Sequence, residues 1–238
     1  MNILLTNDDG YSSIGIQLMK KLLLPLGKVV IVAPKEGMSA KSCSITLGKP
    51  IQIDEISHDV FACSGTPADC VSFALSSLNI DFDLVVSGIN HGNNVSYDTM
   101  YSGTVGACLE ALIFKKPTFA ISTEDNFDLV EQNFSDVWSF ITSNNLLSGE
   151  YLLNINFPLG NIVKGIALGK LHYRKDKNYF IKKEDGYYAH RHMEDLSAPQ
   201  KDTDLYQVNH DLVSIVPLNN SYFSSEIFEK LNNKMIRK

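Results

Sequence analysis

Short, predominantly apolar runs alternate with segments of helical periodicity along the first 160 residues of this chain. Most of these runs are four to seven residues long and lack the polar alternation of a strand with one face in water. Such strands are typical of a mostly parallel sheet with helices on both faces, so we predict an α/β fold. The expected strands are residues 3–6, 29–33, 84–87, 118–122 and 151–157, with minor ones at 51–53 and 60–63. The expected helices are residues 14–26, 67–78, 103–114 and 126–143.

Two of these helices carry more detailed signals. Four apolar residues of the first helix repeat at helical spacing and predict its buried face: Ile14, Leu18, Leu22 and Leu26. The second helix has a defined start, with Thr66 as the N-cap and Pro67 in the first turn. Asp69 stands at the third position, where its carboxylate can bond back to the N-cap.

Residues 165–211 follow a different pattern and are rich in Tyr, Lys, Asp and His. Short strand-like pieces and the turn sequence at residues 184–186 predict hairpins or extended loops, and residues 212–217 predict a last strand. The tail, residues 222–235, has apolar side chains at roughly helical spacing: Tyr222, Phe223, Ile227, Phe228, Leu231 and Met235. We expect one domain over residues 1–238, with a core at 1–160 and the arm, last strand and tail helix at 161–238.

Charge and cysteine content restrict the classes of partner and compartment. Twenty-one Lys and Arg against 27 Asp and Glu give a net charge of −6, which does not attract a nucleic-acid polymer. No stretch approaches the roughly 20 apolar residues of a membrane span, and the first residues do not resemble a secretory signal. The four cysteines, Cys43, Cys63, Cys70 and Cys108, lack CxxC spacing. Free thiols and a cytoplasmic location are therefore expected.

Ligands of parallel sheets bind at the carboxyl ends of the strands, so the segments after each strand are the candidates for function. Asp8 and Asp9 follow the first expected strand. Two adjacent carboxylates repel each other unless a cation lies beside them, and Mg²⁺ or Mn²⁺ accepts oxygen ligands of this kind. The alternative is that residues 8–10 form only an Asx-type turn.

Three later segments can likewise be either ordinary loop and cap structure or part of a functional site. Ser39 lies in a loop that approaches the hydrolase pattern G-x-S-x-G, but Lys41 replaces the last Gly, so Ser39 suits an oxygen ligand better than a nucleophile. Residues 90–94 hold three Asn and one Gly, which can be turn chemistry or an approach to an anion or metal. Residues 102–104 open a helix, where Ser102 can be a plain N-cap or part of a phosphate site. Residues 190–192 predict a solvated hairpin rather than a metal pair.

Six motifs occur in order and together resemble the SurE family, the stationary-phase survival 5′/3′-nucleotidases. They are LLTNDDG at 4–10, VAP at 32–34, SCSIT at 42–46, GTPADC at 65–70, VSGIN at 86–90 and YSGTV at 101–105. The resemblance covers most of residues 1–125 and continues weakly at 202–204 and 213–218. It implies a Rossmann-like, mostly parallel sheet with helices on both faces, a hairpin arm and a C-terminal segment exchanged between subunits.

The resemblance also implies site residues. The metal ligands fall on Asp8, Asp9, Ser39 and Asn90. The phosphate contacts fall on Asn93, Ser102, Gly103 and Thr104. This chain departs from the family at residues 37–40, where Gly-Met-Ser-Ala replaces the usual Glu-Gln-Ser-Gly, at Cys43, where His is common, and at Asp202, where Gly is usual. The liganding serine is kept, whereas loop mobility and substrate preference are left open.

The function implied is a metal-dependent phosphomonoesterase that hydrolyses nucleoside monophosphates. One Mg²⁺ or Mn²⁺ per subunit would activate the attacking water, with Asp8 and Asp9 as the catalytic carboxylates, in a homodimer or homotetramer built through the C-terminal segment. A covalent phosphatase with an Asp nucleophile is a rival, although Asn7 breaks the usual D-x-D pattern. A nucleotide or phosphate sensor without turnover is a second rival.

Overall fold

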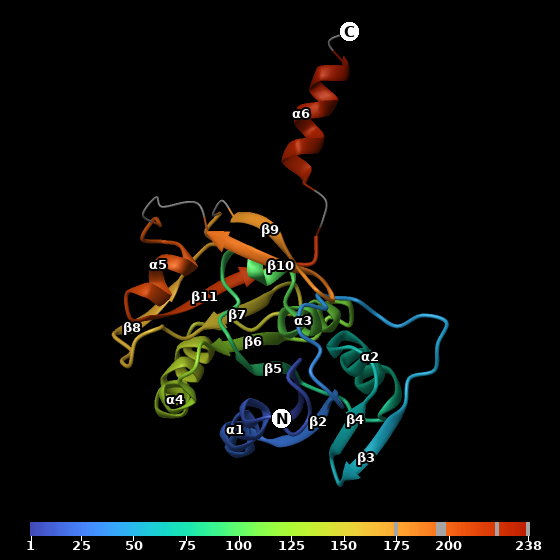
Figure 1. Cartoon of the computed structure of the whole chain (residues 1–238). Helices are drawn as coiled ribbons and strands as arrows, with labels where there is room; N and C mark the ends of the chain where they lie inside the picture. The colour runs from blue at the N-terminus through green and yellow to red at the C-terminus, as the bar shows by residue number, and fades with distance from the viewer. Residues whose placement is uncertain (174–175, 194–198, 222–223, 237–238) are drawn as a thin grey trace.

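A computed structural model describes residues 1–173, 176–193, 199–221 and 224–236. Within these residues a nine-stranded sheet has the order β3-β4-β2-β1-β5-β6-β7-β11-β8, and β9 and β10 form a separate pair (Figure 1). The strands are β1 Asn2–Thr6, β2 Lys28–Pro34, β3 Ile53–Ser57, β4 Val60–Cys63, β5 Leu84–His91, β6 Thr118–Thr123, β7 Leu152–Asn156, β8 Gly165–Leu168, β9 Asp176–Lys183, β10 Gly186–Met193 and β11 Leu212–Leu218. The helices are α1 Ile14–Leu23, α2 Pro67–Ser77, α3 Gly103–Ile113, α4 Phe127–Ser143, α5 Asp204–Asn209 and α6 Ser225–Ile236, with 3₁₀ turns η1 Leu24–Leu26 and η2 Ser96–Met100.

The predicted α/β architecture is confirmed. The six strands from β4 through β2, β1, β5 and β6 to β7 are mutually parallel. Antiparallel pairing occurs only where β3 joins β4 and β11 joins β7 among the strands described in the main sheet. The carboxyl ends of β1, β5, β6 and β7 therefore meet at one edge, where ligands of such sheets bind.

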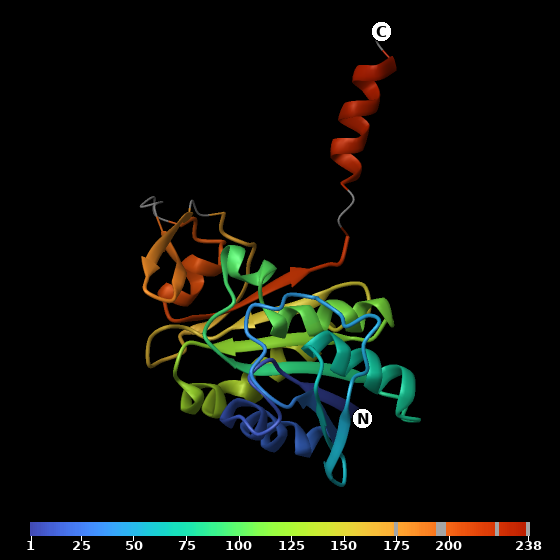
Figure 2. The ribbon, with the colours of Figure 1, turned by 45° about the vertical axis from the view of Figure 1, so that its right-hand side comes forward.

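Burial on both faces explains why the strands are apolar throughout. Along β1, Ile3 and Leu5 pack into one core with α1 and α4, whereas Leu4 packs into the opposite core with α2 and α3. Figure 2 shows these two helix layers on either side of the sheet. Since successive side chains of a strand point to opposite faces, no position of a two-sided strand faces water.

The predicted buried face of α1 is right for its leucines, which are partly buried against the core, and wrong for Ile14. Ile14 is 74% exposed, and the buried apolar side chains of α1 are Ile16, Met19 and Leu23. A β-carbon on Gly15 would lie 1.9 Å from the Ile89 carbonyl oxygen, so the helix touches β5 at its glycine. This close contact turns the helix by about one residue relative to the face marked by the Leu spacing.

Other boundaries also differ from prediction. The minor strand expected at 51–53 lies at β3, and β5 extends to His91, so Asn90 belongs to a strand rather than to the following loop. The short helix α5 and the turn η2 were not predicted. The capping box of α2 is confirmed, since Thr66 accepts from the Asp69 N–H and the Asp69 carboxylate accepts from the Thr66 N–H. Residues 222 and 223 of the expected tail helix lie outside the described residues.

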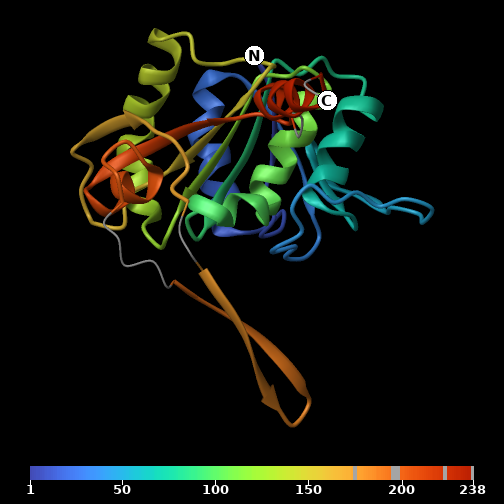
Figure 3. The same ribbon diagram turned by 90° about the horizontal axis from the view of Figure 1, so that it is seen from above.

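Two elements project from the body. The β9–β10 hairpin extends away from the sheet in Figure 3, and α6 stands clear of it in Figure 1. Both carry exposed large apolar side chains: Tyr179, Phe180, Ile181, Tyr187, Tyr188, Ile227, Phe228 and Leu231. No helix in the described part of the chain is long and apolar enough to cross a membrane.

Candidate functional site

The turn after β1 is built by Asn7, and this leaves both aspartates free for other contacts. The Asn7 amide donates to the Gly10 carbonyl (3.0 Å) and to Ser13 Oγ (2.7 Å), and its oxygen accepts from the Gly10 N–H (3.2 Å). Gly10 has φ +105°, which favours glycine. The Asx-type turn is therefore present, but it uses Asn7 rather than Asp8 or Asp9.

Asp8 is a buried carboxylate at the start of α3. Its side chain lies against α3, where Thr104 Oγ1 donates to Oδ1 (2.5 Å). A β-carbon on Gly103 would lie 2.9 Å from Asp8 Cβ, so only glycine permits this approach. Burial raises the pKa of Asp8 to about 6; the Thr104 bond opposes the shift and the charge of Asp9 adds to it.

Asp9 lies closer to solvent than Asp8. Its Oδ2 accepts from the His91 N–H (3.3 Å) at the end of β5. Partial burial raises the pKa of Asp9, and the His91 N–H bond and the His91 side chain oppose that shift. In the described part of the chain, neither Asp8 nor Asp9 forms an ion pair with Lys or Arg. The pair is therefore a site of uncompensated negative charge.

Asn90 and Ser39 lie on segments that flank the two aspartates. Asn90 Nδ2 donates to the Gly92 carbonyl (2.6 Å), which leaves the amide oxygen for a ligand. The Met38 N–H donates to the Asp8 carbonyl (2.7 Å) and so brings the exposed Ser39 to the same edge of the sheet. No cluster of three or more His, Cys, Asp or Glu suited to a metal occurs among the described residues, so an ion here needs the amide and hydroxyl oxygens.

These donors fit a hard divalent cation. Carboxylate, amide and hydroxyl oxygens are the ligands that Mg²⁺ and Mn²⁺ prefer. The charge of Asp8 and Asp9, which has no Lys or Arg partner among the described residues, would attract such an ion, and the hydrogen bond of Asn90 Nδ2 would leave the amide oxygen of Asn90 as a further ligand. The chemistry of the residues present is therefore consistent with the predicted ion.

The predicted phosphate residues are brought to this edge with different contacts. Ser102 Oγ accepts from the Val105 N–H (3.1 Å), so the N-cap interpretation is confirmed for that oxygen. The first turn of α3 directs its positive end at Asp8. Asn93 is hydrogen-bonded to other residues: its Nδ2 donates to the Phe157 carbonyl (3.0 Å), and its N–H donates to Glu124 Oε2 (3.1 Å). A phosphate contact by Asn93 stays a prediction.

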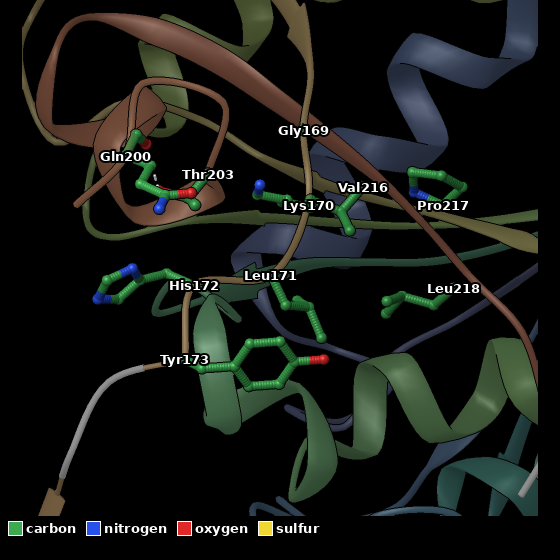
Figure 4. A pocket seen from close by; sticks show the side chains of 10 residues that line it. All are labelled: Gly169, Lys170, Leu171, His172, Tyr173, Gln200, Thr203, Val216, Pro217 and Leu218. Carbon is green, nitrogen blue, oxygen red and sulfur yellow. Dashed lines mark hydrogen bonds between the residues drawn. The ribbon is translucent and has the colours of Figure 1, made fainter. Parts of the chain in front are cut away.

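A cavity of about 890 Å³ lies apart from these residues. Figure 4 shows Leu171, Tyr173 and Leu218 among the side chains that line it, between the segment after β8 and β11. Buried Asp204 ties this segment to η2, because its two carboxylate oxygens accept from the Ser96 N–H (2.7 Å) and the His172 N–H (2.8 Å). No local sequence pattern marks this cavity, since its lining comes from segments that are separated along the chain.

Comparisons with known proteins agree with the motifs. Residues 3–178 match the family model described as Survival protein SurE. A 5′-nucleotidase SurE of Acinetobacter baylyi is 36% identical over 97% of this chain and 98% of its own. One of Clostridium botulinum is 35% identical over 98% of this chain and 97% of its own. The crystal structure of the SurE protein from Aquifex aeolicus has a TM-score of 0.84 and 29% identity, and covers 99% of this chain and 100% of that one.

The buried carboxylate of Asp8 should make the metal-free protein less stable as the pH rises. Because its folded pKa of about 6 exceeds the ordinary 3.8, the stability that Asp8 contributes is fully present below pH 4 and is lost as the pH rises through 6. Asp8→Asn should therefore raise the free energy of unfolding at pH 8, by at most about 3 kcal/mol. Urea unfolding with chelator at pH 4, 6 and 8 measures this.

Asp136→Asn is the matched control, because Asp136 is exposed on α4. It should show no pH-dependent difference from the wild type. An Asp8→Asn protein that is less stable than the wild type at pH 8 would contradict the assignment of uncompensated charge.

Proposed function

The chain belongs to the SurE family, and on that premise we propose that it is a nucleotidase, a phosphoric monoester hydrolase, that acts beside Asp8 and Asp9. Relatives that match nearly its whole length are 5′-nucleotidases by name. The observation that supports this placement is the pair of carboxylates at the carboxyl edge of the sheet and against the start of α3, with no Lys or Arg partner among the described residues. Nucleoside monophosphates are the proposed substrates.

We further propose that Asp8, Asp9, Ser39 and Asn90 hold one divalent cation per subunit, Mg²⁺ or Mn²⁺. When bound, such a cation supplies positive charge to a phosphoryl oxygen and lowers the pKa of a coordinated water. The support is the all-oxygen donor set and the repulsion between Asp8 and Asp9 that an ion would relieve.

The protein's own groups position the phosphate. Backbone N–H groups in the first turn of α3 and the positive end of its dipole suit a phosphate dianion beside Ser102, Gly103 and Thr104. Thr104 holds Asp8 by its hydroxyl, so the carboxylate has a fixed orientation. In the proposed reaction a water oxygen attacks phosphorus and loses a proton, the bond from phosphorus to the nucleoside oxygen breaks, and that oxygen takes up a proton, so that nucleoside and inorganic phosphate leave.

Turnover with and without a chelator tests the function. The wild type should release phosphate from nucleoside monophosphates only with Mg²⁺ or Mn²⁺, and Asp9→Asn should lose about 100-fold or more of that rate. Asp136→Asn should keep the wild-type rate. An Asp9→Asn protein with full activity in excess Mg²⁺ would remove Asp9 from the site, whereas a wild type that binds nucleotide without turnover would favour the sensor.

The stereochemistry at phosphorus separates water attack from the covalent rival. A single in-line displacement inverts the configuration, whereas an aspartyl-phosphate intermediate inverts it twice and gives retention. We predict inversion, because both aspartates are assigned to the cation and Asn7, the remaining polar residue of the turn, is committed to Gly10 and Ser13. Chiral thiophosphate substrates measure this. Retention, or phosphate label trapped on Asp8, would establish the covalent route.

Assembly is the last part of the proposal. A monomer rarely leaves a contiguous apolar surface open, and the exposed Ile227, Phe228 and Leu231 of α6 support a homodimer or homotetramer built through the C-terminal segment. A chain ending at Ser221 should be a monomer or aggregate by light scattering. Leu231→Ser should weaken assembly in the same direction, and Glu229→Ser, on the other side of the helix, should not. An unchanged soluble oligomer of the truncated chain would contradict the proposal.

A further inference from the structure

Three successive backbone N–H groups after β5 are fixed by the two neighbouring strands. The Gly92 N–H donates to the Thr123 carbonyl (2.8 Å), and the Asn93 N–H donates to Glu124 Oε2 (3.1 Å). The Asn94 N–H donates to Asn156 Oδ1 (2.7 Å). Each of these three N–H groups is therefore hydrogen-bonded, although the sequence predicts a loop here.

The Asn156 side chain bonds to both backbone polar groups of Asn94. Its Oδ1 accepts from the Asn94 N–H, and its Nδ2 donates to the Asn94 carbonyl (3.1 Å), so the carboxamide pairs with Asn94 as a neighbouring strand would. Asn154 Nδ2 donates to the same carbonyl (2.8 Å). Both side chains are fully buried and lie two residues apart on one face of β7.

The segment that Asn156 holds is the one that orients Asn90. Asn90 Nδ2 donates to the Gly92 carbonyl, two residues before Asn94, and this bond determines that the amide oxygen is the free end. Asn94 Nδ2 also donates to Ser122 Oγ (3.0 Å), and Ser122 is the register partner of Asn90 between β5 and β6. Asn156 is thus linked through Asn94 to two neighbours of Asn90. One is the segment that carries the Gly92 carbonyl, and the other is Ser122 on β6.

We propose that Asn156 is a positioning residue for the cation ligand Asn90, an inference that rests on the proposed function. A buried carboxamide costs free energy unless it is fully bonded, and an apolar side chain would fill the end of β7 without that cost. In the described part of the chain, the two hydrogen bonds of the Asn156 side chain both go to the backbone of Asn94. Partners behind a metal ligand usually influence affinity because they fix the ligand's orientation.

The test compares Asn156→Leu with Asn154→Leu by titration of Mn²⁺, read from the electron paramagnetic resonance of the free ion. Asn156→Leu should weaken Mn²⁺ binding about 10- to 100-fold. Asn154→Leu should weaken it less than about 3-fold, because Asn156 keeps its two bonds and Asn154 Oδ1 has no hydrogen-bond partner in the described structure. Both changes remove a fully buried amide from one face of one strand, so they control for general destabilisation.

Activity gives a second measurement. Raising Mn²⁺ to saturation should restore the kcat of Asn156→Leu to within about 3-fold of the wild type, because the defect lies in holding the ion. A purely structural role would not respond to Mn²⁺. Equal Mn²⁺ affinity in the wild type and Asn156→Leu, or equal losses in the two Leu variants, would overturn the proposal while leaving the proposed function intact.

If Asn156→Leu does not fold, Ser122→Ala replaces it as the test variant, since this change removes only the bond from Asn94 Nδ2. It should weaken Mn²⁺ binding by about 3- to 10-fold, and unchanged affinity would count against the positioning role. A wild type that binds no Mn²⁺ would overturn the metal site and this inference together, whereas binding without turnover would overturn the nucleotidase alone.

Discussion

Repulsion between two neighbouring carboxylates is the constraint on which the rest of the site depends. Asp8 is buried against α3 and Asp9 lies beside it at the end of β1, and burial raises the pKa of both. In the part of the chain that the structure describes, no Lys or Arg pairs with either carboxylate to relieve the repulsion. The protein surrounds the pair with neutral donors instead: the Thr104 hydroxyl and the His91 N–H. Such an arrangement leaves most of the negative charge of the pair in place.

The sheet brings these residues together, because its parallel strands end at one edge. Apolar side chains occupy both faces of β1 and β5, so the polar residues Asp8, Asp9 and Asn90 collect at the carboxyl edge. Close backbone approach then brings the covering helices to that edge. Gly15 lets α1 touch β5, and Gly103 lets α3 begin against Asp8, where a β-carbon would clash. The position of α3 in turn directs the positive end of its dipole at the site.

Much of the fold could be predicted from local patterns, and the failures have identifiable causes. The runs at β1, β2 and β6 and the capping box of α2 depend on residues close in sequence, so the prediction succeeded. Ile14 was wrongly placed on the buried face of α1 because the contact between Gly15 and Ile89 joins residues far apart in sequence. The extension of β5 to His91 was missed because residues 88–91 have the composition of a turn, whereas pairing with β6 holds them as a strand. Helix α5 was missed because it is short and because its buried Asp204 is hydrogen-bonded to Ser96 and His172, which are distant in the sequence.

By itself the sequence determined the two-sided sheet, the Asp8-Asp9 pair after the first strand and the helix start at Ser102, because each is a local pattern with a direct physical meaning. Only the tertiary structure decided the role of each polar residue at the edge. It assigned the turn to Asn7, and it brought Asn156 to the peptide of Asn94, which precedes it by 62 residues. An isolated Asn in a strand carries no information on its partner, since hydrogen bonds between distant segments form only after packing has placed the two strands side by side.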